Sequence, residues 1–284
     1  MNGIIPDAFR LGPATLRVSD AEQALDFYVN KIGLSLHARD DKRAVLGAAL
    51  EDLLILEFHP GLTPRDPRES GLYHVAIRLG GRVALGAVIA RLAAHRVKLG
   101  AADHLVSEAI YLWDPDNNGI EIYRDRPREE WHWADGQVQM SNRPLDYQGL
   151  LAQRDVARLA QQPLGDGTII GHIHLQVDDL ARAREFYVDV VGFAPVSTFP
   201  GAQFVSAGGY HHHLAMNIWD SRNGPLPSPD KAGLSQMTFL LPDRASAEAL
   251  RARLQAAGTD TVEAGDGFDF SDPWRTKVAV RLQG

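Results

Sequence analysis

Two segments of the chain, RVSDAEQALDFYVNKIGL at residues 17–34 and QVDDLARAREFYVDVVGF at residues 176–193, follow one pattern. Asp20 of the first segment matches Asp179 of the second, and a Phe-Tyr pair begins seven residues after each aspartate. Near the end of each segment lies a glycine, Gly33 or Gly192. An aspartate at this place is typical of a helix N-cap, and a glycine after the last periodic residue is typical of a helix end. The segments therefore predict the same unit twice, a strand followed by a capped amphipathic helix.

A second pair of matching segments follows the first pair, GLYHVAIRLGGR at residues 71–82 and GLSQMTFLLPDR at residues 233–244. Each precedes a helical stretch, and each half of the chain then reaches an Asp-Pro turn and a last strand. Matching segments at this spacing indicate duplicated units. We therefore expect an α+β fold in which four βαβββ modules pair into two barrel-like domains.

The matching segments also predict where the modules begin and end. We expect the modules at residues 8–60, 70–126, 169–220 and 231–284. Residues 127–168 are polar and unpatterned in their first half and more helical in their second half. We interpret them as a linker between the second and third modules.

The composition argues against several kinds of partner. With 45% hydrophobic and 23% charged residues, the 284-residue chain is typical of a globular protein. A net charge of −7 without a basic stripe argues against nucleic acid. No apolar run approaches the roughly 20 residues that span a bilayer, and the start MNGIIPDAFR has no secretory pattern. We expect a cytoplasmic protein with no membrane partner.

The chain contains no cysteine, which limits the metal chemistry that it can support. Disulfides, thiolate zinc sites and thiol nucleophiles are excluded, so a metal would be bound by histidine and carboxylate side chains. From composition alone, iron, manganese, nickel and zinc all remain open.

The most specific motif is DHLVSEAIYLWDPDNNGIE at residues 103–121, which combines a histidine, a tyrosine, an Asp-Pro turn and a final glutamate. Together with the repeats, it resembles the vicinal oxygen chelate superfamily of glyoxalases, bleomycin resistance proteins and dioxygenases. Within that superfamily it is most similar to the extradiol catechol 2,3-dioxygenases. The resemblance covers nearly the whole chain. Asn117 stands where a glycine is usual, and Ala102 begins the motif less typically.

The resemblance implies that metal ligands come from the first residue of a module's opening strand and from a carboxylate on its closing strand. The opening positions are Pro13, His74, His172 and Gln236, and the closing positions are Glu57, Glu121, Asn217 and Ala279. Pairing the first module with the second would leave His172 without partners. Pairing the second with the third collects His74, Glu121 and His172, and we expect this arrangement.

Each proposed ligand also has a structural interpretation. A lone strand histidine such as His74 is more often a structural residue, although the repeated position favours a ligand. His174 faces the same side of its strand as His172, but His172 lies seven residues before the capping Asp179, as the resemblance requires. Two histidines and one carboxylate form the facial triad of non-haem Fe(II) oxygenases. The expected cofactor is Fe(II), with Mn(II) as the alternative.

The run GGYHHHLAM at residues 208–216 is predicted to be a strand, so His212 would face one side and its two histidine neighbours the other. The resemblance places an active-site histidine here, and His212 aligns best as the acid–base residue. It also implies that His104 and Tyr111 form hydrogen bonds with the substrate oxygens or the reaction intermediate. As structural alternatives, Tyr111 would be a core aromatic residue and His104 a surface residue.

The resemblance thus implies an Fe(II)-dependent extradiol ring-cleaving dioxygenase in aromatic catabolism, whose partners are a small aromatic diol and O2. One alternative is another metalloenzyme of the superfamily, a glyoxalase or an epimerase that uses nickel, cobalt or zinc. The other is a metal-free protein that binds a planar small molecule. An oligomer is compatible with the sequence.

Overall fold

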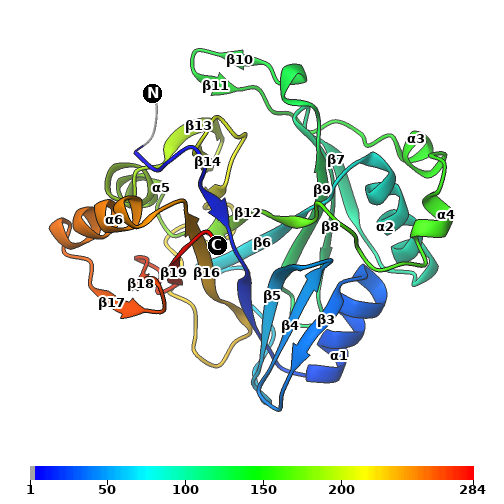
Figure 1. The fold of residues 1–284 in the computed structure, drawn as a ribbon, viewed down its shortest axis with the longest axis horizontal. Coiled ribbons are helices and arrows are strands. Elements are labelled where there is room, and N and C mark those ends of the chain that lie inside the picture. Colours follow the sequence, from blue (N-terminus) through cyan, green and yellow to red (C-terminus); the bar gives the residue numbers. More distant parts are fainter. Residues whose placement is uncertain (1–3) are drawn as a thin grey trace.

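The structure is a computed structural model that describes residues 4–284, and two large curled β-sheets make up most of it (Figure 1). The first sheet combines strands from both ends of the chain. In order across the sheet, its strands are β17 (Thr261–Ala264), β18 (Gly267–Ser271), β19 (Lys277–Leu282), β16 (Gly233–Leu241), β2 (Ala14–Val18), β5 (Glu51–Phe58), β4 (Arg43–Ala48) and β3 (Ser35–Arg39), and β1 (Arg10–Leu11) also pairs with β16.

The second sheet is formed by the middle of the chain. In order, its strands are β13 (Ala194–Phe199), β14 (Ala202–Ser206), β15 (Leu214–Asn217), β12 (Ile169–Gln176), β6 (Gly71–Arg78), β9 (Gly119–Asp125), β8 (Ser107–Trp113) and β7 (Gly100–Asp103). Buried apolar side chains from both sheets form one contiguous core, as in a single packed unit.

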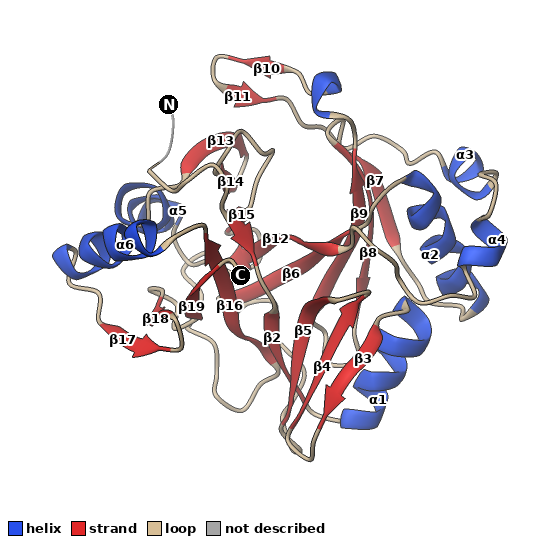
Figure 2. Ribbon diagram, in the orientation of Figure 1, coloured by secondary structure: helices blue, strands red, loops and turns tan. Residues whose placement is uncertain are grey.

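Short helices cover the sheets. They are α1 (Ala21–Leu25), which continues as the π-helix η1 (Asp26–Ile32), α2 (Arg82–Ala94), the 3-10 helix η2 (Arg128–Glu130), α3 (Tyr147–Leu151), α4 (Val156–Leu159), α5 (Leu180–Arg184), which continues as the π-helix η3 (Glu185–Val190), and α6 (Arg244–Ala256). Figure 2 shows α2, α3 and α4 together on one side of the molecule and α5 and α6 on the opposite side. None of the helices in residues 4–284 is long and apolar enough to cross a membrane.

The strand pairing shows how the modules combine. In every module the first strand pairs in parallel with the last, as β2 with β5, β6 with β9, β12 with β15 and β16 with β19. Antiparallel pairing of β6 with β12 joins the second module to the third, and pairing of β2 with β16 joins the first to the fourth. The predicted α+β fold of paired modules is confirmed, and the modules pair in the expected combination.

The capping residues of the repeat act as their positions predict. The carboxylate of Asp20 accepts the backbone N–H of Gln23, and that of Asp179 accepts the N–H groups of Ala181 and Arg182. Gly33 follows η1 with a φ of 101°, in the left-handed region that glycine adopts at low cost. Each helix therefore begins and ends where the sequence pattern changes.

The predicted linker contains more regular structure than its sequence pattern indicates. A short hairpin of β10 (Trp133–Ala134) and β11 (Gln137–Val138) lies in its polar first half, and α3 and α4 follow. The buried guanidinium of Arg91 in α2 donates to the carbonyl oxygens of Ala160 at 2.9 Å and Ile32 at 2.6 Å. This arginine joins the segment after α4 to the first and second modules.

Candidate functional site

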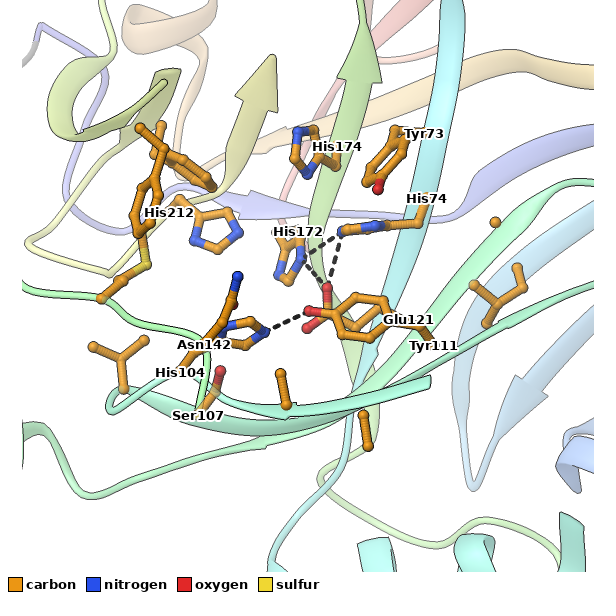
Figure 3. A pocket seen from close by; sticks show the side chains of 18 of the residues that line it. Tyr73, His74, His104, Ser107, Tyr111, Glu121, Asn142, His172, His174 and His212 are labelled. Atoms are coloured by element: carbon orange, nitrogen blue, oxygen red, sulfur yellow. Dashed lines mark hydrogen bonds and ion pairs between the residues drawn. The ribbon is translucent and has the colours of Figure 1, made fainter. Parts of the chain in front are cut away.

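Three side chains from neighbouring strands meet at the seam between the second and third modules (Figure 3). His74 lies on β6, Glu121 on β9 and His172 on β12. Glu121 Oε2 lies 2.9 Å from the Nε2 atoms of both histidines, which are 3.2 Å from each other. The structure thus brings together the three residues that the sequence predicted as metal ligands.

The strand register explains why these side chains converge. Ala76 of β6 pairs with Glu121 on one side and with His172 on the other, so these two side chains project from the same face as that of Ala76. His74 lies two residues before Ala76 on the same strand and therefore projects from that face too. The small side chain of Ala76 leaves space above the sheet for the longer ones. Each histidine is the fourth residue of its strand, so the expectation that ligands come from the first residue of the opening strand was wrong.

The chemistry of this group suits a metal ion. All three side chains are buried, and their three converging atoms each offer a lone pair. Burial lowers the pKa of His172 to about 4, so its imidazole is neutral at neutral pH. Burial alone would raise the pKa of Glu121, but His172 and His74 hold it well below its usual value. Neutral imidazoles and an ionised carboxylate are the protonation states that bind a metal.

The three residues lie in a cavity of about 540 Å³, which is large enough for a small aromatic molecule. Aromatic side chains form much of its wall, namely Tyr73, Trp113, Phe199, Phe204 and Trp219. Of the described residues that line it, none is a lysine or an arginine. The cavity therefore combines an apolar wall with a polar floor.

His104 and Tyr111 form a hydrogen-bonded pair in the cavity wall. Nδ1 of His104 lies 2.9 Å from the carbonyl oxygen of Ser141, which can only accept, so Nδ1 carries a proton. In the neutral ring Nε2 then accepts from the Tyr111 hydroxyl at 2.6 Å. Burial raises the pKa of Tyr111 well above its usual value, so the hydroxyl keeps its proton.

The histidine run differs from the predicted strand. Strand β15 begins at Leu214, so His211, His212 and His213 lie in the turn before it and do not alternate between two faces. Different partners hold the first and the third of these histidines. His211 Nε2 lies 2.8 Å from Asp125 Oδ1, and His213 Nδ1 lies 3.0 Å from Ser206 Oγ.

His212 is the residue of the run that lines the cavity. Its ring centroid lies 4.1 Å from that of His172, and Figure 3 shows the two rings side by side. Burial lowers the pKa of His212 well below its usual value, so the ring is neutral and one of its nitrogens carries a lone pair. The structure thus places His212, which the resemblance singled out, in the wall of the cavity, although the predicted strand alternation of the run was wrong.

Several polar residues of the cavity were not predicted, among them His174 and Asn142. His174, which the sequence placed beside His172 without a role, accepts a hydrogen bond from Asn217 Nδ2 to its Nε2 at 3.0 Å and lines the cavity. Alternation along the strand could have assigned it to the cavity. Asn142 lines the cavity from the predicted linker, where no pattern in the sequence marks it.

The equivalent positions on the first sheet do not form a similar group. Glu57 accepts a hydrogen bond from Ser235 Oγ at 3.1 Å and is partly exposed. Within residues 4–284, His74, Glu121 and His172 form the one cluster of three such side chains that could hold a metal. Pro13, Gln236 and Ala279 have no side-chain group that ordinarily ligates iron.

Comparison with known proteins gives consistent results. The model of the Glyoxalase/Bleomycin resistance protein/Dioxygenase superfamily matches residues 10–122 and 169–279. A protein of Bacillus subtilis (strain 168) named catechol-2,3-dioxygenase is 42% identical over 268 residues, which cover 93% of this chain and 93% of that protein.

Solved structures share the fold at low sequence identity. A Bacillus subtilis protein described as a dioxygenase superposes with a TM-score of 0.66 at 11% identity, over 99% of this chain and 86% of that one. Glyoxalase I from Zea mays superposes with a TM-score of 0.57 at 18% identity, over 96% and 92%. At these identities the two structures establish a common fold and nothing about activity.

Proposed function

Because the chain belongs to the Glyoxalase/Bleomycin resistance protein/Dioxygenase superfamily, we propose that it is an Fe(II)-dependent extradiol dioxygenase that opens a catechol-type ring with O2. The observation that carries this proposal is the convergence of His74, Glu121 and His172 at the floor of an aromatic cavity. The 42% identity to the Bacillus subtilis catechol-2,3-dioxygenase supports the same activity.

In this proposal the metal would be held by His74, Glu121 and His172, whose side chains line the cavity. Two imidazoles and one carboxylate form the facial triad that suits Fe(II), and Mn(II) is the second metal that fits the same donors. When bound, the metal supplies a position at which the diol and dioxygen lie side by side and exchange electrons.

The surrounding residues bind the diol and move its protons. His212, neutral and beside His172, accepts a proton from a diol hydroxyl and returns it as the ring opens. When the diol binds, the Tyr111 hydroxyl turns from His104 and donates to the nearest substrate oxygen. His104 stays in position because its Nδ1 donates to the carbonyl oxygen of Ser141. The aromatic wall contacts the faces of the ring and excludes water.

A metal-dependent assay tests the proposal. Protein purified without oxygen and freed of metal with a chelator should cleave catechol to the yellow ring-fission product only after Fe(II) or Mn(II) is added. Loss of the metal removes the position that binds both substrates, so we expect activity to fall by roughly 10²-fold or more without it. Equal activity with and without metal would refute the proposal.

Two glutamate variants test the ligand assignment by metal content alone. Glu121→Ala removes the one anionic ligand of the three, and we expect it to lose most of the bound iron because its charge neutralises the metal. Glu57→Ala, which removes a carboxylate of the other sheet that lies outside the cluster, should keep its iron. Equal iron retention in the two anaerobically reconstituted variants would contradict the assignment.

A further inference from the structure

We propose that Asp125 and His211 form a hydrogen-bonded chain that fixes the tautomer of His212, so that its cavity-facing nitrogen is a proton acceptor. The chain runs from Asp125 Oδ1 to His211 Nε2 at 2.8 Å, and from His211 Nδ1 to His212 Nδ1 at 2.8 Å. Its catalytic consequence rests on the proposed function, in which His212 is the acid–base residue, but the tautomer itself does not.

The direction of the chain follows from the donors and acceptors at each contact. An ionised carboxylate can only accept, so His211 Nε2 carries the proton that faces Asp125. In the proposed chain His211 is a neutral imidazole with a single N–H, so its Nδ1 offers a lone pair and His212 Nδ1 donates to it. Nε2 of His212 is then left without a proton.

The other contacts of Asp125 orient its carboxylate. Tyr210 donates to Oδ2 at 3.0 Å, and Arg78 Nη1 donates to the same oxygen at 3.4 Å. The Tyr210 hydroxyl also lies 3.2 Å from Oδ1, so Oδ2 faces both donors, whereas Oδ1 faces His211 and shares the Tyr210 hydroxyl. His211 is completely buried, and water therefore does not compete for its two nitrogens.

The position of His212 makes the free nitrogen useful. Its Nδ1 is engaged with His211, while its ring lines the cavity and packs on His172 and Phe204. Nε2 is thus the nitrogen that can meet a bound molecule. His213, the third residue of the run, interacts with Ser206 and lies outside the chain. Asp125 and His211 therefore act as positioning residues for His212.

Asp125→Asn is the sharpest variant because it changes hydrogen-bond direction with little change in volume. Tyr210 and Arg78 require an oxygen on their side, so the amide nitrogen should face His211 and donate to Nε2. His211 would then donate from Nδ1 to His212, which would present an N–H to the cavity. His213→Gln is the matched control, since it replaces a histidine of the same turn outside the chain.

The first measurement reads the tautomer directly and does not depend on turnover. The full chain, labelled with ¹⁵N-histidine and loaded with Zn²⁺ as a diamagnetic ion, gives two-bond ¹⁵N–¹H correlations that identify the protonated ring nitrogen of each histidine. Loss of its signals in His212→Gln assigns His212. We expect His212 to be protonated at Nδ1 in wild type and His213→Gln, and at Nε2 in Asp125→Asn. Nε2 protonation in wild type, or no change in Asp125→Asn, would overturn the proposal.

The second measurement tests the catalytic consequence. With iron content equal, Asp125→Asn should lower kcat by roughly 10²-fold or more while KM for catechol changes little, because proton transfer is lost but binding is kept. His213→Gln should retain kcat per folded, iron-loaded molecule. A reversed tautomer with unchanged kcat would show that the chain does not serve turnover. A wild type with the expected tautomer and no ring cleavage would refute only the proposed function.

Discussion

The imidazole of His212 packs on His172 without joining the three atoms that converge on the candidate metal position. It is bound through Nδ1 to His211, and its other nitrogen is available to the cavity. His213 is different, because its ring packs edge-on against Phe9 at a centroid distance of 5.1 Å and its Nδ1 contacts Ser206. Neighbouring histidines in one turn thus have separate environments and should have separate roles.

We predict that His212→Ala retains its iron and still binds catechol, because the three proposed ligands are unchanged. Its turnover should fall by roughly 10²-fold or more, the usual loss when a positioned proton acceptor is removed. Iron content, catechol binding and turnover of the anaerobically prepared variant check this. His213→Ala should mainly lower stability, with turnover per folded molecule nearly retained. Loss of iron in His212→Ala would make His212 a ligand and contradict the assignment.

The proposed ligands could be predicted from the sequence because the repeat compares equivalent positions in four modules. His74 and His172 stand where Pro13 and Gln236 stand in the other two, which a single unrepeated strand could not reveal. The contact between Asp125 and His211 could not be predicted. The two residues are 86 positions apart, and no local pattern links them.

The Phe-Tyr pair of the repeat has a definite structural use in each half of the chain. The hydroxyl of Tyr28 in η1 donates to Asp114 at 2.8 Å, and that of Tyr187 in η3 donates to Asp272 at 2.7 Å. Asp114 Oδ1 also accepts the backbone N–H groups of Asp116 and Asn118. The carboxylate therefore shapes the turn that leads into β9, which carries Glu121.

The pKa of Asp114 makes this interaction dependent on pH. Burial raises its pKa to about 6, against hydrogen bonds from Asn118 and Tyr28 that lower it. Since the folded-state value exceeds the usual 3.8, the protonated form favours folding. Its contribution is complete below about pH 4 and is lost as the pH rises through about 6. Above this pH, Asp114 is an ionised, buried carboxylate, and its stability in the fold depends on hydrogen bonds from donors such as Tyr28 and Asn118.

Tyr28→Phe removes one of these donors with little change in packing. We predict a loss of unfolding free energy of about 1–3 kcal/mol near pH 8, where Asp114 is ionised, because a buried carboxylate loses a partner. The loss should be smaller near pH 4.5, where Asp114 is protonated. Denaturant unfolding of the variant and wild type at both pH values measures the difference. Equal losses at the two pH values would show that Asp114 is not the group affected.

The helices and most strands could be predicted because caps and alternation are local signals. The histidine turn was predicted as strand because apolar residues follow it directly, but two glycines with positive φ, Gly208 at 58° and Gly209 at 61°, precede it. His211 bonds to Asp125, His213 to Ser206, and the neighbours His211 and His212 to each other, whereas adjacent side chains of a regular strand point to opposite faces. The hairpin of β10 and β11 was missed because its strands have two residues each.

The two sheets of the molecule repeat the same seam with different side chains. The seam of β6 and β12 carries the two histidines beside the cavity, whereas at the seam of β2 and β16 Ser235 of β16 donates to Glu57 of the neighbouring strand β5. The seam that carries the candidate metal site could be predicted from the sequence, because only the pairing of the second module with the third brings two histidines and a glutamate together. The cavity wall could not be, because Met140 and Asn142 come from the predicted linker and the rest from several strands and loops.

The cavity between the second and third modules should also select its substrate by charge. Of the described residues that line it, none is a lysine or an arginine. The chain as a whole has a net charge of −7. A carboxylate on the substrate would therefore lose its hydration in an apolar cavity that offers it no cationic side chain, and this desolvation costs free energy of binding.

We predict that kcat/KM for catechol and 4-methylcatechol exceeds that for 3,4-dihydroxybenzoate by roughly 10²-fold or more, on the scale of an unpaired buried charge. Ring-fission rates of the iron-loaded protein with the three compounds measure this. Trp219 lines the cavity and is 47% exposed, so Trp219→Arg can place a cation at its edge. This variant should lower the discrimination against 3,4-dihydroxybenzoate, whereas Trp219→Phe, which adds no charge, should keep it. Comparable kcat/KM values for catechol and 3,4-dihydroxybenzoate in wild type would mean that the cavity recognises the carboxylate through groups that open to it on binding, and would refute selection by charge.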